Sequence, residues 1–269
     1  MTASAQQHGP VTNKGMITLL VMMATIMEVL DLTIANVAIP HMMGSLSATQ
    51  DEITWVLTSY VVASAIMMLP TGWLAGRFGR KRVFLVAIAS FTLSSALCGI
   101  ASSLGEMVCF RLLQGASGAS LVPMSLAILM DIIPKEKHGS AMAMWGVGIM
   151  VAPILGPTLG GYLTEYFDWR WIFFINLPVG ILAFMGISAF LSETALHDRP
   201  FDVFGFLTLS LTIGAIQLML DRGDHADWFA SMEIIAYAGV AAGMFWMFIA
   251  HARYAVHPFL SAEMFRDRN

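Results

Sequence analysis

The chain has 269 residues, of which 57% are hydrophobic and only 12% are charged, and its mean hydropathy is +0.73. Soluble domains carry about 25% charged residues, so this composition excludes an ordinary soluble protein and indicates a polytopic membrane protein. The net charge is −4, and the sequence contains no basic patch that would bind nucleic acid. The two cysteines and seven histidines are too scattered to form a metal site.

Apolar runs of about 20 residues, the length that crosses a bilayer as a helix, predict an all-α protein with eight membrane spans. The runs lie at residues 16–38, 53–75, 83–104, 107–130, 141–163, 170–191, 203–220 and 233–252. Residues 1–15 are predicted to form a disordered tail. Residues 192–202 are expected to form a polar linker before the last two spans, and residues 253–269 to form a second polar end.

The first run carries two acidic residues, Glu28 and Asp31, in its second half. A charge near the centre of a bilayer costs at least about 2.5 to 3.5 kcal/mol, so both carboxyls must face protein, water or a partner. Residues three apart lie on one face of a helix, and two carboxyls held together there tend to share a proton. The pair is therefore a candidate proton-coupling site. Alternatively, Glu28 only keeps a vestibule wet, and Asp31 anchors its helix to a basic residue.

Basic residues gather in the loops on one side of these spans. Eleven of the 14 Lys and Arg residues lie there: Lys14, Arg77, Arg80, Lys81, Arg82, Lys135, Lys137, Arg199, Arg253, Arg266 and Arg268. Only Arg170 and Arg222 lie in the opposite loops. Because cytoplasmic loops carry an excess of Lys and Arg, both ends of the chain are expected in the cytoplasm. The acidic segment 221–227 is then expected to face outward.

The loop between the second and third runs reads GWLAGRFGRKR, residues 72–82. Its glycines, Gly72, Gly76 and Gly79, are predicted to end a helix and to let a tight turn approach other backbone closely. Its four basic residues are predicted to lie at the cytoplasmic face: Arg77, Arg80, Lys81 and Arg82. A plain basic anchor is the alternative reading.

The fourth run opens with Arg111 in apolar surroundings, and Gln114 follows on the same helix face. A buried Arg needs an acceptor, and the only acids upstream in a span are Glu28 and Asp31. A contact between Arg111 and Asp31 is therefore predicted. The alternative is that the Arg111 side chain snorkels to the nearer interface. The small residues at 115–119 favour close helix packing.

The fifth run combines two prolines with five glycines in residues 146–161. Proline removes a backbone donor and bends a helix, while glycine lets a neighbouring helix approach closely. This density favours a gate over a merely kinked structural helix. The candidate substrate and gating residues in this run are Pro153, Gly156, Pro157, Gly160 and Gly161.

The segments around the fifth and sixth runs supply further expectations. Residues 169–171, Trp-Arg-Trp, are expected to mark the outer interface, and Asn176 to make hydrogen bonds between helices. Cys98 and Cys109 are expected to be buried, unreactive thiols. The last two runs carry almost no charge, so the working site is expected in the first six.

Five motifs, in order along the chain, are similar to those of one family. They are LDLTIANVAIP at 30–40, GWLAGRFGRKR at 72–82, RLLQG at 111–115, APILGPTLGG at 152–161 and WRWIFFINLPVG at 169–180. On these residues the chain resembles the major facilitator superfamily and, within it, the EmrB/QacA type of drug:proton antiporter with fourteen spans. The GPTLGG portion is similar to the motif that marks antiporters, and segment 218–229 resembles the EmrB branch.

The resemblance implies that residues 16–191 form a six-helix N-terminal transporter bundle of two inverted repeats, and residues 203–252 two additional helices. It carries family roles onto Asp31, Arg111, Gln114, Gly156 and Pro157, with Glu28 as an extra acid. Gly76 stands where the loop motif usually has an aspartate, so a charge relay through that position is in doubt. The family continues for six further spans, so this chain, which stops at Asn269, is expected to be part of a longer transporter.

The resemblance also implies an inner-membrane protein that exchanges inward-moving protons for outward-moving amphipathic or cationic drugs, with no cofactor beyond the proton. For the EmrB branch, a periplasmic adaptor protein and an outer-membrane channel are implied partners. Two alternatives stay open: a metabolite uniporter or symporter of the same superfamily, and a membrane fragment that does not transport. An enzyme is not expected, because no nucleophile, base and orienting group converge in the sequence.

Overall fold

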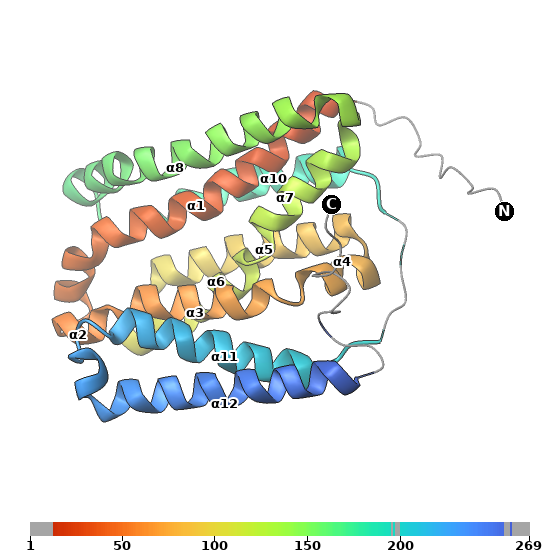
Figure 1. Cartoon of the computed structure of the whole chain (residues 1–269). Coiled ribbons are helices and arrows are strands. Elements are labelled where there is room, and N and C mark those ends of the chain that lie inside the picture. The colour runs from red at the N-terminus through yellow and green to blue at the C-terminus, as the bar shows by residue number, and fades with distance from the viewer. Residues whose placement is uncertain (1–12, 195, 197–199, 256–258, 260–269) are drawn as a thin grey trace.

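The computed structural model describes residues 13–194, 196, 200–255 and 259. Within these residues the chain is helical and has no strand. Long helices run side by side in alternating directions, with α8 along one side of the assembly and α12 along the other (Figure 1). The predicted all-α, polytopic fold is confirmed.

The helices begin and end close to the predicted apolar runs. Their bounds are α1 Lys14–Ser45, α2 Gln50–Ile53, α3 Trp55–Met68, α4 Thr71–Phe78, α5 Arg80–Ile100, α6 Leu104–Gly118, α7 Leu121–Ile132, α8 His138–Tyr166, α9 Trp171–Phe174, α10 Asn176–Phe190, α11 Val203–Arg222 and α12 Met232–Tyr254. Seven helical segments are long and apolar enough to cross a membrane, and the bent helices of residues 50–78 make up to eight. The count of eight predicted spans therefore corresponds to treating that bent segment as one.

Helix α1 is longer than predicted and occupies the centre of the bundle. It runs from Lys14 to Ser45 rather than over 16–38, and Pro40 lies inside it without ending it. It packs against α8 and α10, and less extensively against α7. Its contact with α8 is close because three α8 positions are glycine: a Cβ at Gly148, Gly156 or Gly160 would meet α1 atoms.

The second span is bent rather than straight. Its two parts, residues 50–68 and 71–78, meet at 54°. Pro70 lies at this break, where its ring removes a backbone donor. The prolines of α8, by contrast, lie in an uninterrupted helix.

Only one of the three loop glycines forms the predicted turn. Gly79 adopts φ 91°, a conformation that strongly favours glycine, and separates α4 from α5. Gly72 and Gly76 lie inside α4, and a Cβ at either would meet nothing within 4 Å. The prediction that these two glycines permit a close backbone approach is therefore wrong.

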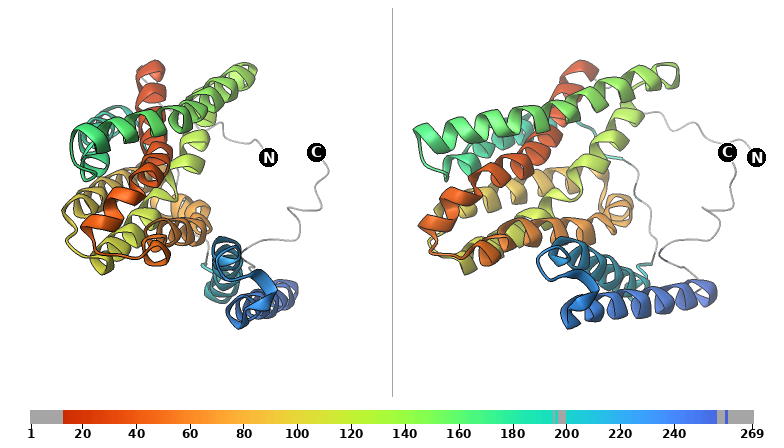
Figure 2. Two further views of the ribbon diagram at one scale, coloured as in Figure 1. Left: turned by 90° about the vertical axis from the view of Figure 1, so that its left-hand side faces the viewer. Right: turned by 60° about the vertical axis from the view of Figure 1, so that its left-hand side comes forward.

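Helices α11 and α12 form a hairpin beside the other helices (Figure 2). The hairpin contacts the rest of the described chain through α11 and α3. At one end of this contact the Thr58 hydroxyl donates a hydrogen bond to the Asp221 carboxylate. Arg222 lies there too, 5.5 Å from the ring centroid of Trp55, and its Nε donates to Glu233 of α12 at 2.5 Å.

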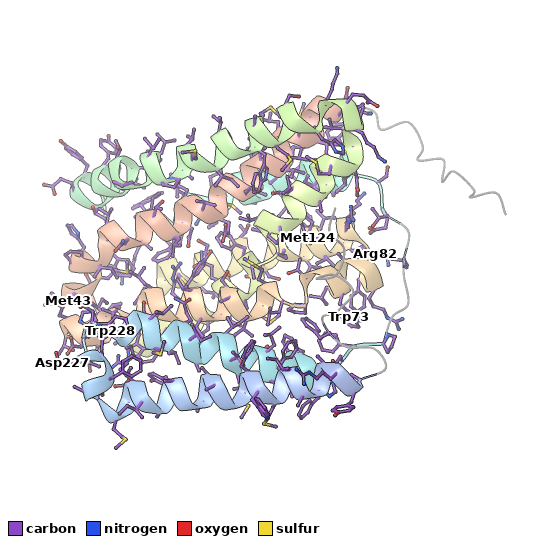
Figure 3. All side chains as sticks on the ribbon, in the orientation of Figure 1. Met43, Trp73, Arg82, Met124, Asp227 and Trp228 are labelled. Atoms are coloured by element: carbon purple, nitrogen blue, oxygen red, sulfur yellow. The ribbon has the colours of Figure 1, made fainter. Side chains whose placement is uncertain are left out.

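The two ends of the bundle carry loops of opposite charge. Figure 3 shows Trp73 and Arg82 at one end, and Met43, Asp227 and Trp228 at the other. The basic loop and the acidic loop therefore lie at opposite ends, as the topology prediction requires.

Two apolar clusters meet along α1. One contains α1 residues as far as Met27 and packs them against α5, α7 and α10. The other takes α1 from Leu30 onward and packs it against α6, α8 and the 169–173 segment. Glu28 and Asp31 thus lie where one cluster gives way to the other, near the middle of the helix.

Candidate functional site

Asp31 is the centre of a buried polar network. Only 2% of the residue is exposed, and its carboxylate accepts three hydrogen bonds from three different side chains. Arg111 Nη1 donates to Oδ2 at 2.6 Å, while Gln114 Nε2 and Asn176 Nδ2 donate to Oδ1 at 2.8 and 2.6 Å. The network joins α1, α6 and α10.

Arg111 is completely buried, so its guanidinium does not snorkel to the interface. Besides Asp31, it donates through Nη1 to Gln114 at 2.9 Å and through Nε to the Val56 carbonyl at 3.1 Å. The Tyr60 ring lies against it, with 4.2 Å from the guanidinium carbon to the ring centroid. Its Nη2 has no hydrogen-bond partner in the described part of the chain. The predicted contact between Arg111 and Asp31 is confirmed.

A second set of polar contacts holds these donors in place. Asn176 Nδ2 also donates to Ser95 Oγ at 3.0 Å, and that hydroxyl donates to the Phe173 carbonyl at 2.9 Å. The Cys98 thiol lies 3.4 Å from Gln114 Oε1 and donates to it. These residues bring α5 into the network, which joins α1, α6 and α10 at the Asp31 carboxylate and includes α3 through Arg111.

Glu28 lies one helical turn before Asp31 and has very different surroundings. It is half-buried rather than buried. Its one hydrogen bond among the described residues comes from the Tyr60 hydroxyl, 3.2 Å from Oε1. Tyr60 therefore contacts both acidic and basic members of the site, through its hydroxyl and its ring face respectively.

The arrangement is that of a charge-paired carboxylate in an apolar bundle. Desolvation of two charges is offset only where the geometry is good and the remaining polar atoms are paired. Asp31 meets this condition with three donors. Removing one partner of such a pair leaves an uncompensated buried charge and destabilises a protein by about 3 to 5 kcal/mol. The network is therefore expensive to disturb.

The candidate gating residues of α8 lie beside this network rather than in it. Gly156 packs against Thr33, and Gly160 against Ile34, each within a turn of Asp31 on α1. Pro153 and Pro157 are exposed on the outer face of α8, and a Cβ at Gly161 would meet nothing within 4 Å. Two of the five candidates thus bring α8 onto α1, and the other three do not.

Three basic residues of segment 72–82 make their contacts at the end of the bundle, away from Asp31. Arg80 forms an ion pair with Asp131 at the end of α7. Lys81 Nζ donates to the Ser188 carbonyl at 2.8 Å. The backbone N–H groups of Lys81 and Arg82, in the first turn of α5, donate to the Glu193 carboxylate at 3.0 and 3.2 Å.

Some site residues were not found from the sequence, and two interpretations need correction. Tyr60 was missed, although the polar Thr-Ser-Tyr segment at 58–60 interrupts an apolar run. Trp169 is buried, 3% exposed, and its indole N–H donates to Ser45 Oγ, so it is a packing residue rather than part of an outer belt. Cys109 is exposed, not buried, because it lies on the outer face of α6.

Within the described residues, no group of three or more His, Cys, Asp or Glu side chains could hold a metal ion. The site is therefore built from one ion pair, one further carboxyl, two amides and hydroxyls. Such groups can bind and release protons or hold a cation.

Comparison with known sequences identifies relatives over nearly the whole chain. Residues 21–254 match the family described as Major Facilitator Superfamily. Multidrug export protein EmrB of Haemophilus influenzae is 43% identical over 100% of this chain and 54% of that protein. Fatty acid resistance protein FarB of Neisseria gonorrhoeae is 43% identical over 94% of this chain and 50% of that protein. EmrB of Escherichia coli K12 is 40% identical over 98% of this chain and 52% of that protein.

The chain spans about half the length of the curated relatives it matches. Solved structures show the same fold. The POT family transporter PepTSo superposes with a TM-score of 0.63 at 13% identity, over 85% of this chain and 51% of that one. A bacterial homologue of the human lysosomal transporter Spinster, in an inward-facing conformation, superposes with a TM-score of 0.60 at 16% identity, over 91% and 64%.

Proposed function

The chain belongs to the major facilitator superfamily, and from this membership we propose that it works in proton-coupled multidrug efflux. In this proposal, protons move inward across the membrane while amphipathic or cationic compounds move outward. The names of the relatives, which export drugs or confer resistance to fatty acids, support this substrate class. The proton serves as the coupling ion, so no cofactor is required.

The observation that carries the proposal is the ion pair of Asp31 and Arg111 in the middle of the bundle. Intramembrane ionisable residues are expensive and mark ion or substrate pathways by default. The neighbouring carboxyl of Glu28 completes a site in which proton binding would change the net charge. We assign proton coupling to Asp31, Glu28 and Arg111, and the orientation of the pair to Gln114.

The close packing of α1 and α8 supports a proposal of alternating access. We propose that residues 16–191 form one transport bundle, which moves as a unit against a second bundle, and that the 203–252 hairpin is a separate pair. Gly156 and Gly160 would let α1 and α8 slide in close contact. The assignment of a gate to α8 as a whole, including Pro153, Pro157 and Gly161, remains part of this proposal.

The charged ends support an orientation in the membrane. We place the basic end, which contains Arg82, in the cytoplasm and the acidic 221–227 segment outside. The N-terminus would then be cytoplasmic, and the membrane would be the inner membrane of a Gram-negative cell. Resemblance to the EmrB branch supports a periplasmic adaptor protein and an outer-membrane channel as partners.

A proton-flux measurement tests the proposal. Everted vesicles would be prepared from cells that express the full coding sequence containing these residues, energised by respiration and followed with a fluorescent pH-gradient dye. Addition of a lipophilic cation such as tetraphenylphosphonium should partly collapse the gradient. Asp31→Asn should abolish the response, because it leaves Arg111 without its counter-ion, while the exposed Asp168→Asn variant should respond normally.

Two results would count against this function. If the wild type binds the cation but the gradient does not change, antiport is wrong and a uniporter or symporter becomes the better reading. If Asp31→Asn inserts normally and still responds fully, the coupling site lies elsewhere.

A further inference from the structure

The two acidic residues of α1 differ in how completely their carboxylates are satisfied. Asp31 is buried and holds three hydrogen bonds, one of them from a guanidinium. Glu28 is half-buried and holds one, from a neutral hydroxyl. No cation contacts Glu28 in the described part of the chain.

Protonation has different consequences at the two positions. Adding a proton to Asp31 would leave Arg111 as a fully buried cation without a counter-ion, in a site where it has already lost its hydration. It would also turn one acceptor oxygen into a donor, facing side chains that all donate to it. Adding a proton to Glu28 breaks no ion pair, and the resulting carboxyl keeps the Tyr60 hydroxyl as a partner.

We propose that Glu28 is the carboxyl that exchanges protons with solvent, and that Asp31 stays ionised as the fixed counter-ion of Arg111. The inference rests on the proposed proton-coupled function and divides between the two acids a role that the sequence analysis gave to the pair. In the exchange, one O–H bond forms on a Glu28 carboxylate oxygen with a proton from water, and the same bond breaks on release. Asp31 and Arg111 neither gain nor lose a proton.

Tyr60 is the positioning residue that links this exchange to the ion pair. Its hydroxyl donates to Glu28, and its ring face lies 4.2 Å from the Arg111 guanidinium carbon. A Cβ on Gly118 of α6 would lie 3.2 Å from the Tyr60 hydroxyl oxygen, so this hydroxyl has little room to move toward α6. A change in the charge of Glu28 would therefore be transmitted to a tyrosine that cannot shift without disturbing Arg111.

Among the described residues, the other elements around α1 present no further carboxyl group at this level. Helix α3 contributes Tyr60, and α6 contributes Arg111. The sequences of α9 and α10 contain no titratable side chain. Helices α7 and α8 carry theirs near their ends: Asp131 on α7, and His138, Tyr162, Glu165 and Tyr166 on α8. Cys98 of α5 contacts Gln114. The remaining acids, Asp51 and Glu52 of α2 and Glu106 of α6, lie in short or first-turn segments at the ends of the bundle.

Infrared difference spectroscopy tests the assignment without requiring transport. The purified full-length protein would be titrated across the neutral pH range, and the carbonyl band of protonated carboxyl groups would be recorded. The wild type should show a carboxyl band whose intensity changes with pH and whose frequency is that of a carboxyl group shielded from water. Glu28→Gln should remove it, while the control Glu165→Gln, an exposed acid at the end of α8, should keep it.

Two further variants test the division of roles. Asp31→Asn should keep the titrating band, although it lowers stability. Tyr60→Phe should keep the band but shift the pH at which it titrates, a change that loss of packing alone would not produce. If Asp31→Asn fails to fold, Glu28→Gln decides the matter by itself: a band that survives in Glu28→Gln overturns the proposal.

A second measurement separates this inference from the proposed function. Proton release would be recorded in unbuffered solution as tetraphenylphosphonium is added to the same samples. If the wild type shows the Glu28 band but neither binds the cation nor releases protons, the assignment of Glu28 stands and drug:proton antiport fails. If cation binding releases protons in the wild type and equally in Glu28→Gln, antiport stands and the assignment of Glu28 is wrong.

Discussion

At the scale of single residues, the most deeply buried ion pair in the described chain is that of Asp31 and Arg111. Its two charges are buried almost completely, at 1% and 0% side-chain exposure, so water screens them little. A buried ion pair of this kind can be neutral for the stability of the folded protein, but removing one of its two charges is strongly destabilising. This makes the pair testable by removing its members singly and jointly.

The first prediction concerns stability. Arg111→Gln should lower the free energy of unfolding by about 3 to 5 kcal/mol, because Asp31 is then a buried, uncompensated charge. The double variant Asp31→Asn with Arg111→Gln should be clearly less destabilised than the sum of its two single variants. Unfolding in detergent, followed by tryptophan fluorescence, measures all four proteins. Strict additivity would show that the two side chains do not interact.

At the residue scale, the sequence predicted the charged pair and the interhelical hydrogen bonds of Asn176, but neither the partner of Asn176 nor the role of Tyr60. The contact of Arg111 with Asp31 could be foreseen because a buried Arg needs an acid and few acids were available. The roles of Asn176 and Tyr60 depend on how α10 and α3 are rotated about their axes, which the sequence does not specify. Asn176 was expected to make hydrogen bonds between helices, but its partner Asp31 was not identified.

At the scale of elements, glycine determines how closely the helices pack. A Cβ on Gly115 of α6 would lie inside contact distance of the Tyr60 carbonyl oxygen of α3, which is backbone and cannot rotate away. Gly105, at the start of the same helix, has nothing within 4 Å of a Cβ. A glycine-to-alanine change at these two positions has a similar effect on helix propensity, but only at Gly115 does the added methyl group meet another helix.

The second prediction uses this pair. Gly105→Ala should leave the melting temperature unchanged or raise it slightly, since alanine favours a helix over glycine by up to about 1 kcal/mol. Gly115→Ala should lower it, and should also weaken transport by displacing Tyr60 from Arg111. Equal melting temperatures for the two variants would mean that α3 and α6 are not in close contact.

The hydrophobic runs predicted where the spans lie, but they did not predict where a span bends. The apolar runs located the ends of every long helix to within four residues, except the last residue of α1, which is Ser45 rather than residue 38. The break at Pro70 was not foreseen, because proline bends some spans and is accommodated in others. Pro40, Pro153 and Pro157 lie within continuous helices. Sequence alone does not distinguish these cases, since neighbouring helices decide whether a freed carbonyl is tolerated.

At the scale of the whole molecule, one carboxylate closes the base of the α11–α12 hairpin. Asp202 accepts hydrogen bonds from the Gly205 N–H at 2.9 Å, the Phe259 N–H at 2.9 Å and His251 Nε2 at 2.8 Å. It therefore caps α11 and contacts the end of α12. Burial by itself raises the pKa of Asp202, but the Gly205 N–H, His251 and the Phe259 N–H together hold this pKa below its ordinary value.

The third prediction is a pH dependence with a defined sign. Because the pKa of Asp202 is lower in the folded protein, its charged form contributes stability that is fully present above the ordinary carboxyl pKa of about 3.9. That contribution disappears as the pH falls through the folded pKa. The difference in melting temperature between the wild type and Asp202→Asn should thus persist from about pH 8 to pH 5 and shrink below about pH 4. A difference that vanished at pH 6 would contradict this account.

The fourth prediction concerns how the hairpin is attached. Thr58→Val removes the hydrogen bond to Asp221 at similar volume, and should increase proteolysis or hydrogen exchange in α11 and α12 while leaving α1 and α6 protected. Thr49→Val, which alters the exposed cap of α2, is the control. Uniform loss of protection throughout the chain would show that the hairpin and the remaining helices unfold as one unit.

The ion pair has a further consequence, which concerns the membrane potential. A charge displaced through the field of a membrane gains or loses about 2.3 kcal/mol per 100 mV. Asp31 and Arg111 together carry no net charge, so a bundle that rocks with both of them in place is almost indifferent to voltage. In the proposed cycle, Glu28 and the bound compound then decide what net charge moves. Pairing the deeper acid permanently would leave Glu28 as the carboxyl of α1 through which the membrane potential could act.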